Sequence, residues 1–225
     1  MRQELSWNPF IHIEEAVKTI NLSGLRVLDA GCGTGGLSLA VAPHVKRVLS
    51  LDTDPRALEV LERSVIEQGF ENVRPVCADV FGFTPPEKPN VLVCCSFGHP
   101  GEVPALAKKL GVKTVLLVKR DHREHRFSKN SHPVEGDSAA SAEEELASLG
   151  IPFTSERFTA EAGQPFKDLA EARLFFSAYG REDASVYTDD FLKSRLIPSN
   201  DPEFPLYLPN ERQLTLIAFK GKDIP

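Results

Sequence analysis

The chain has 225 residues, of which 26 are basic and 32 are acidic, so its formal net charge is -6. Hydrophobic residues make up 41% and charged residues 26%, as in an ordinary globular domain. This length suits one large domain, or one domain plus a small appendage, with a core that needs no disulfide or metal for stability. The acidic balance argues against a protein that binds nucleic acid by broad phosphate neutralisation, so we expect no nucleic-acid partner. No apolar run approaches the roughly 20 residues of a membrane span, and residues 1–10 lack the apolar stretch of a signal peptide.

The cysteines do not have the paired spacing that is typical of a zinc site. They are Cys32, Cys77, Cys94 and Cys95. Two of them are adjacent in an apolar run, as buried free thiols commonly are. The sequence therefore predicts reduced thiols, no metal site and a cytoplasmic protein.

Apolar stripes and short apolar runs alternate along the first 120 residues. The expected elements, in chain order, are a helix over 11–20, a strand over 25–29, a glycine-rich loop over 31–36, a helix over 37–41, a strand over 45–51, a helix over 54–69, strands over 73–77 and 91–95, a helix over 103–110 and a strand over 114–118. Strands that alternate with helices predict βαβ units and a parallel sheet. Ligands of such sheets bind outside the carboxyl ends of the strands.

The second half of the chain has weaker patterns. Ser141 and Glu144 have the spacing of a capping box, which predicts a helix that ends at Gly150. Strands are expected over 153–158 and 213–219. Between them we expect a helix over 167–179, a short helix over 189–196 and, because it holds four prolines, a loop over 198–209.

The glycine-rich loop carries the chemistry. Gly31, Gly33 and Gly36 satisfy the dinucleotide pattern GxGxxG, and Asp52 lies about 20 residues further on. Asp29, however, precedes the first glycine by two residues and would oppose a pyrophosphate held at the helix N-terminus. A ligand with a cationic end and no phosphate suits this loop better, and S-adenosylmethionine is such a ligand. An NAD-dependent oxidoreductase remains the alternative for the same glycines.

The segment Asp29-x-Gly31-x-Gly33-x-Gly35 resembles motif I of the class I S-adenosylmethionine-dependent methyltransferases. The resemblance covers about residues 25–120, and the C-terminal elements are similar to the small-molecule branch that includes quinone-pathway enzymes. It implies an α/β fold: a Rossmann-like, seven-stranded, mostly parallel sheet with helices on both faces. It also implies an antiparallel last strand and a small helical cap.

The same resemblance implies roles for individual residues. Asp52 ends the second strand, where the family's acid accepts hydrogen bonds from the ribose hydroxyls. Asp79 stands where the family's acid accepts from the adenine amine, and Cys95 lies at the end of the fourth strand, beneath the methyl group. The implied cofactor-binding residues are Asp29, Gly31, Gly33, Gly35, Asp52, Thr53, Asp79, Val80 and Cys95.

His99 follows the fourth strand, where this fold brings the acceptor to the methyl donor. An imidazole titrates near neutral pH, so His99 is a candidate catalytic base; the alternative is a loop histidine that packs on Pro100. The run Cys95–His99 replaces the Asn-Pro-Pro-Tyr-type motif of the family's amino-methylating members. That replacement argues against adenine, glutamine and other planar amide acceptors.

Two further features have open interpretations. His122, His125 and His132 lie in a polar region, but no nearby carboxylate or cysteine completes a metal site. Basic residues gather at 119–129, which indicates a solvated loop or a lip that attracts an anionic substrate. Trp7 and Phe10 are interpreted as a lid over the site or as N-terminal packing.

The sequence therefore predicts a single methyltransferase domain over 1–225, with cap segments 1–24 and 160–210. The predicted function is methyl transfer from S-adenosylmethionine to a small-molecule acceptor. The alternatives are an NAD-dependent oxidoreductase and a non-catalytic protein that binds S-adenosylmethionine; RNA or protein methylation is a lesser one. The sequence leaves the acceptor and the oligomeric state open.

Overall fold

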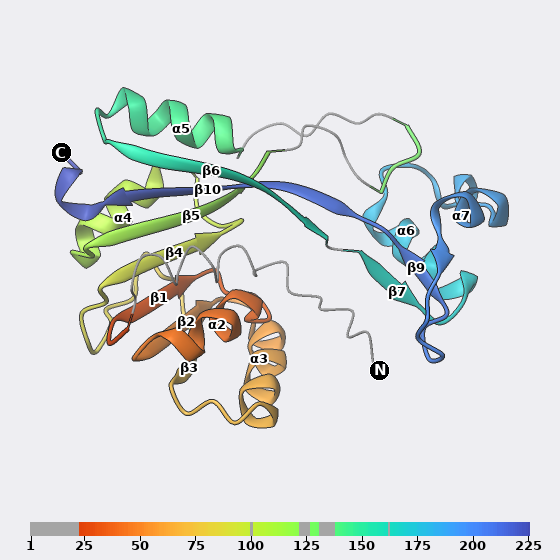
Figure 1. Cartoon of the computed structure of the whole chain (residues 1–225), viewed down its shortest axis with the longest axis horizontal. Coiled ribbons are helices and arrows are strands. Elements are labelled where there is room, and N and C mark those ends of the chain that lie inside the picture. The colour runs from red at the N-terminus through yellow and green to blue at the C-terminus, as the bar shows by residue number, and fades with distance from the viewer. Residues whose placement is uncertain (1–22, 100, 122–126, 131–137, 162) are drawn as a thin grey trace. The chain divides into compact units, whose positions relative to one another are not determined.

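A computed structural model describes residues 23–99, 101–121, 127–130, 138–161 and 163–225 (Figure 1). The strands are β1 (Arg26–Ala30), β2 (Arg47–Asp52), β3 (Val73–Cys77), β4 (Val91–Cys95), β5 (Thr114–Arg120), β6 (Phe153–Glu161), β7 (Gln164–Phe166), β8 (Ile197–Pro198), β9 (Leu206–Leu208) and β10 (Glu211–Lys220). The α-helices are α2 (Gly36–Val41), α3 (Pro55–Glu67), α4 (Glu102–Leu110), α5 (Ala139–Ser148), α6 (Leu169–Tyr179) and α7 (Asp189–Arg195). Short 3₁₀ turns occupy Ala42–His44, Ala184–Val186 and Gly221–Asp223.

Seven strands form one sheet in the order β3-β2-β1-β4-β5-β10-β6, which can be followed in Figure 1. The neighbours β1 and β2, β2 and β3, β1 and β4, and β4 and β5 are parallel. Strand β10 pairs with β5 in the antiparallel direction. The chain leaves β3 at one edge and returns to β4 beside β1, so the order of the strands reverses between β1 and β4. This switch point is where ligands of open parallel sheets bind.

Helices cover both faces of this sheet. Side chains alternate between the two faces along a strand, so the neighbours of successive β1 residues show which helices cover which face. Leu28 and Ala30 of β1 pack in one cluster with Leu106 of α4 and Leu146 of α5. Asp29 lies between them in sequence and points to the opposite face, where it contacts α2. The seven-stranded, mostly parallel sheet with an antiparallel last strand is therefore confirmed.

The chain divides into two compact units. The larger holds the described residues of 8–121, 137–158 and 214–225, and the smaller holds those of 122–136 and 159–213. Within the smaller unit β7, β9 and β8 form an antiparallel sheet. Beside that sheet, α6 and α7 contribute to an apolar core that includes Phe166, Phe176, Tyr187 and Leu192. The placement of cap segments over the strand ends stays a prediction.

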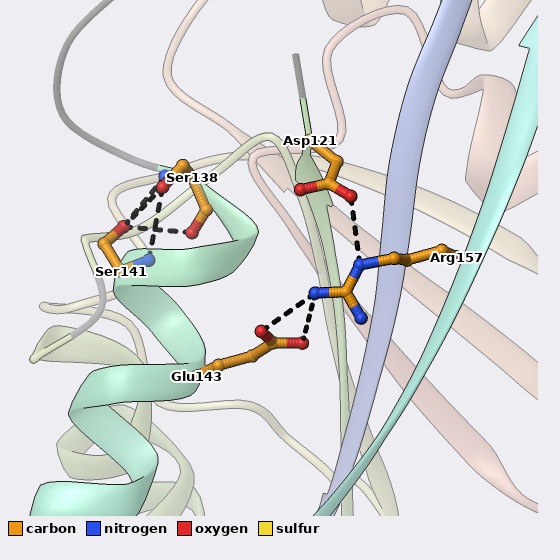
Figure 2. A network of polar contacts seen from close by, with 5 residues as sticks. All are labelled: Asp121, Ser138, Ser141, Glu143 and Arg157. Carbon is orange, nitrogen blue, oxygen red and sulfur yellow. Dashed lines mark hydrogen bonds and ion pairs between the residues drawn. The ribbon is translucent and has the colours of Figure 1, made fainter. Parts of the chain in front are cut away.

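Two local predictions in the second half were wrong. The capping box of α5 lies one turn earlier than predicted: the N-cap is Ser138, whose side chain accepts from the Ser141 N–H, while the Ser141 hydroxyl accepts from the Ser138 N–H (Figure 2). A serine replaces the usual glutamate as the reciprocal partner. The proline-rich stretch 198–209 is not all loop, since it contains Pro198 of β8 and all of β9. Proline is compatible with short edge strands, where it removes few ladder hydrogen bonds.

An ion-pair network joins three elements of the larger unit beside the α5 cap (Figure 2). The Arg157 guanidinium of β6 donates to Asp121, just after β5, at 3.1 Å and to Glu143 of α5 at 3.1 Å. All three side chains are partly exposed, so the network adds little to the free energy of unfolding. It links the end of β5 to α5 and β6. Within the described residues, no helix is long and apolar enough to cross a membrane.

Candidate functional site

Three carboxylates follow or lie near the carboxyl ends of adjacent strands. Asp29 is the fourth residue of β1, Asp52 is the last residue of β2, and Asp79 follows β3 by two residues. The parallel register aligns Ala30 with Leu51 and Asp52 with Cys77. These strand ends therefore meet at one edge of the sheet, as the sequence predicted for a ligand site.

The glycine-rich loop lies between β1 and α2 and has backbone angles that disfavour a side chain. Gly31, Gly33 and Gly35 have φ values of +68°, +54° and +83°, in the left-handed region that glycine adopts at no steric cost. A Cβ on Gly31 would lie 2.2 Å from the Phe97 ring, and one on Gly35 would lie 2.1 Å from Leu61. Glycine is thus favoured at Gly31 and Gly35 by both backbone angle and space, and at Gly33 by backbone angle alone.

Asp52 joins this loop to the end of β2. One carboxylate oxygen accepts from the Gly33 N–H at 2.7 Å, and the other accepts from the Asp54 N–H at 2.9 Å. The side chain is only partly buried, and an ionised carboxylate offers about four acceptor positions. Asp52 therefore keeps acceptor capacity for a ligand with two neighbouring hydroxyl groups.

Asp29 lies at the centre of a buried polar network, with an exposed fraction of 1%. Its Oδ2 accepts from the Ser38 hydroxyl of α2 at 2.6 Å, and the Ser38 hydroxyl lies 2.7 Å from that of Ser50 in β2. Its Oδ1 is buried without a hydrogen-bond partner. Burial raises the pKa of Asp29 to about 6, opposed by the Ser38 hydrogen bond and reinforced by the charge of Asp52. The site thus contains a buried hydrogen-bond acceptor, Asp29 Oδ1, that a donor group of a ligand could satisfy directly or through a water molecule.

The third carboxylate is more accessible. Asp79 is exposed, and its Oδ1 accepts from the Phe81 N–H at 3.0 Å, which shapes the turn after β3. Val80 is 3% exposed and packs in the main core, so any ligand contact that it makes comes from its backbone. Thr53 is exposed beside Asp52. The ligand roles predicted for these residues stay predictions.

The segment after β4 lies against the glycine loop. Cys95 ends β4 half-buried, and Ser96 has a φ of +52°, unusual for a residue with a side chain. The Phe97 ring contacts Gly31 and stacks 6.2 Å from the Phe81 ring. His99 is exposed, and its backbone N–H donates to the Glu102 carboxylate at 3.0 Å. Its role as a base stays a prediction.

The four cysteines are free thiols: Cys94 is buried, Cys32 and Cys95 are partly buried, and Cys77 is exposed. Burial, followed by the charges of Asp29 and Asp52, raises the pKa of Cys32 above its ordinary range. This thiol of the glycine loop is therefore protonated at neutral pH and a poor nucleophile. Among the described residues, no group of three His, Cys, Asp or Glu could hold a metal ion. His122, His125, His132, Trp7 and Phe10 lie outside the described residues.

Sequence reasoning missed several residues of this site. Ser38 and Ser50 support Asp29 from two other elements, and Phe97 fills the space that Gly31 leaves. Lys119, assigned to a solvated basic cluster, is instead 1% exposed in β5. The position of Lys119 directly after the apolar run of β5 was a sequence signal of its burial. The sequence held no such signal for Ser38 and Ser50, because their hydrogen bonds join separate elements.

A basic hollow elsewhere in the larger unit does not belong to this site. Its volume is about 460 Å³, and it lies at the start of β5 and the end of β10, lined by Lys108, Lys113, Lys220 and Lys222. Two of these ammonium groups already bond to oxygens, of Pro225 and of Thr114. It lies at the opposite end of β5 from the three carboxylates.

The residues present are compatible with S-adenosylmethionine. Asp52 has acceptor capacity for a ribose diol, Asp79 has an exposed carboxylate for an amine donor, and Asp29 has an unpartnered buried oxygen. A dinucleotide suits the loop less well, because its pyrophosphate at the glycine loop would lie near the Asp29 carboxylate.

Comparisons with known proteins agree with this geometry. Residues 27–114 match a family model described as a methyltransferase domain. The ubiquinone biosynthesis O-methyltransferase of Leptothrix cholodnii is 37% identical over 75 residues, which cover 32% of each chain. The ribosomal RNA small subunit methyltransferase G of Methylococcus capsulatus is 33% identical over 84 residues, covering 36% of this chain and 41% of that one. The chain thus spans about a third of the length of the first of these curated relatives and about two fifths of the second.

The fold has a counterpart among solved structures. The YcgJ protein of Bacillus subtilis superposes with a TM-score of 0.56 at 16% identity, covering 93% of this chain and 98% of the other. That likeness extends the shared fold well beyond the matched segment. Together, the glycine loop, the three carboxylates and the match over residues 27–114 show that this segment is similar to a methyltransferase domain.

Proposed function

We propose that this chain transfers a methyl group from S-adenosylmethionine to a small-molecule acceptor. The observation that carries the proposal is the arrangement of Asp29, Asp52 and Asp79 around the glycine loop, at the ends of three adjacent parallel strands. Each carboxylate has an acceptor oxygen or acceptor capacity suited to a different part of the cofactor. Similarity over part of a ubiquinone biosynthesis O-methyltransferase supports a small acceptor.

The chain's own contribution is to bind and orient. S-adenosylmethionine would supply a methyl group on a sulfonium centre, from which the neutral thioether is a good leaving group. Asp52 would hold the ribose and Asp79 the adenine. Asp29, kept in place by Ser38, would hold the cationic methionine end together with the backbone of the glycine loop. The turn after β4 would present the acceptor. Holding two reactants in line supplies much of the acceleration for such a transfer, and His99 would take a proton only from an acceptor that is protonated at neutral pH.

RNA is a second candidate acceptor, because the chain is also similar to part of a ribosomal RNA methyltransferase. Formation of S-adenosylhomocysteine over a panel of phenols, quinols, carboxylic acids and amines, with a ribosomal RNA transcript in parallel, separates the two candidates. Turnover on a small acceptor supports the proposal. Turnover on RNA alone contradicts the small-molecule assignment, and tight cofactor binding without turnover favours a non-catalytic protein.

A matched pair of variants tests the role of Asp52. Asp52→Ala should weaken S-adenosylmethionine binding by about 1–3 kcal/mol, the scale of lost hydrogen bonds to a charged group. Asp54→Ala is the control, since Asp54 is the N-cap of α3 and accepts from the Arg56 N–H at 3.0 Å. Asp54→Ala should lower the melting temperature without weakening the binding of S-adenosylmethionine. If both variants bind S-adenosylmethionine with equal affinity, Asp52 does not bind the ribose.

A further inference from the structure

A lysine is buried at the carboxyl edge of the sheet, inside the strand that neighbours β4. Lys119 of β5 is 1% exposed, although lysines are almost never fully buried unless paired. Its ammonium donates to the backbone carbonyl of Phe97 at 2.9 Å and to that of Gly98 at 2.5 Å. The charge therefore faces the turn after β4 and not the solvent.

That turn has a backbone that needs support. Ser96 has a φ of +52° and Gly98 a φ of +72°, and the first of these is a sparsely populated conformation for a residue with a Cβ. The Ser96 N–H donates to the Val118 carbonyl of β5 at 2.9 Å. At the far end of the turn, the Glu102 carboxylate accepts from the His99 N–H at 3.0 Å. Strand β5 thus holds the turn twice, once through its backbone and once through Lys119.

The turn after β4 also positions the aromatic ring of Phe97. Phe97 lies between its two anchored neighbours, and its ring covers the face of Gly31 that a side chain would fill. The same ring stacks at 6.2 Å on Phe81, two residues after Asp79. A shift of the Phe97 carbonyl would therefore move a ring that contacts the cofactor loop on one side and the turn carrying Asp79 on the other.

We propose that Lys119 is a positioning residue: its ammonium fixes the turn Ser96–His99 and, through Phe97, the packing of that turn against the glycine loop. The role in methyl transfer rests on the proposed function, because it assumes that the glycine loop holds S-adenosylmethionine. An ammonium suits this task because it has three donors and no acceptor, so it can bind two carbonyls of one turn at once. An apolar side chain of similar length would fill the space and leave both carbonyls without this donor.

Three variants test the proposal. Lys119→Met removes the donors while keeping a long side chain, Lys119→Arg keeps a charged donor, and Lys113→Met is the control, an exposed lysine just before the same strand. Hydrogen exchange of the backbone amides reports the turn without any ligand. Calorimetry with S-adenosylhomocysteine reports the cofactor loop.

For Lys119→Met we expect the hydrogen-bonded amides of Ser96 and His99 to exchange about tenfold faster or more, with β1 and β2 unchanged. The affinity for S-adenosylhomocysteine should fall by about tenfold, because the loop is no longer preorganised. Lys119→Arg should restore most of both losses, and Lys113→Met should change neither. Unchanged exchange at Ser96 and His99, or faster exchange spread equally over the whole sheet, overturns the proposal.

The wild-type protein supplies a test that does not depend on whether Lys119→Met folds. A ¹⁵N-labelled Lys119 ammonium held by two carbonyls should exchange its protons more slowly than exposed lysines do; equal rates contradict the proposal. Failure of the proposed function is a separate outcome. If the wild-type chain does not bind S-adenosylhomocysteine, the cofactor assignment fails, while the exchange comparison still decides whether Lys119 fixes the turn.

Discussion

Replacing Asp29 with asparagine should stabilise the ligand-free protein at pH 8 and change its stability much less under acid conditions. Asp29 is buried, and burial raises the pKa of its carboxyl from 3.8 to about 6. Between these two values the folded protein binds more protons at this group than the unfolded chain does. Stability from this group is therefore greatest when the carboxyl is protonated and falls as the pH rises through about 4 to 6.

The expected size follows from the shift. A difference of about two pKa units corresponds to about 3 kcal/mol, and roughly two thirds of it develops between about pH 4.5 and pH 8. The asparagine of the Asp29→Asn variant would not titrate, and its side-chain oxygen could still accept from Ser38, so the variant avoids the cost of a buried charge. For a chain of this size, a gain of about 3 kcal/mol raises the melting temperature by roughly 6–12 °C.

Urea unfolding of both proteins at several pH values measures this directly. The difference in unfolding free energy should grow steadily toward pH 8, since groups common to both proteins cancel. Asp54→Asn is the control: its carboxyl is exposed, its pKa is lowered by the hydrogen bonds with Arg56, and asparagine also caps helices well. It should show no gain at pH 8. A difference for Asp29→Asn that is independent of pH, or a loss of stability at pH 8, would refute the reasoning.

Three further predictions concern the glycine loop and the α5 cap. Gly31→Ala should weaken S-adenosylmethionine binding, measured by calorimetry, by about tenfold or more, because its Cβ would overlap an aromatic ring. The control Gly24→Ala has a similar φ but open space around the Cβ, and it should leave binding unchanged. Equal effects of the two variants would contradict the steric argument. Iodoacetamide should alkylate exposed Cys77 faster than Cys32, whose pKa is raised by burial. Mass spectrometry of the labelled peptides measures the two rates, and faster labelling of Cys32 would contradict this prediction. Ser138→Ala should lower the unfolding free energy by about 1 kcal/mol through loss of the cap; an unchanged urea midpoint would show that the cap contributes nothing.

The parts of the site that sequence predicted share one physical property: they are local. The left-handed angles at Gly31, Gly33 and Gly35 belong to a single loop, and Asp52 ends a strand whose apolar pattern is unambiguous. The helix predicted over 54–69 also agrees with α3, whose N-cap is Asp54. Short-range patterns of this kind carry their structural meaning within a few residues.

The parts that it missed depend on contacts between elements. The hydroxyl of Ser38 reaches Asp29 across the space between helix and strand, and Lys119 reaches the Phe97 carbonyl from a neighbouring strand. Nothing in either local pattern specifies such a partner. The α5 cap was misplaced for a related reason, because Ser138 and Ser141 are both acceptable cap residues and only the backbone angles decide between them.

Calorimetry with S-adenosylmethionine and with NAD tests which of the two ligands the glycine loop and its three carboxylates bind. We expect wild-type protein to bind S-adenosylmethionine at one site per chain, Asp52→Ala to bind it more weakly, and NAD to give no comparable binding. Tight binding of NAD without binding of S-adenosylmethionine would contradict the proposed cofactor.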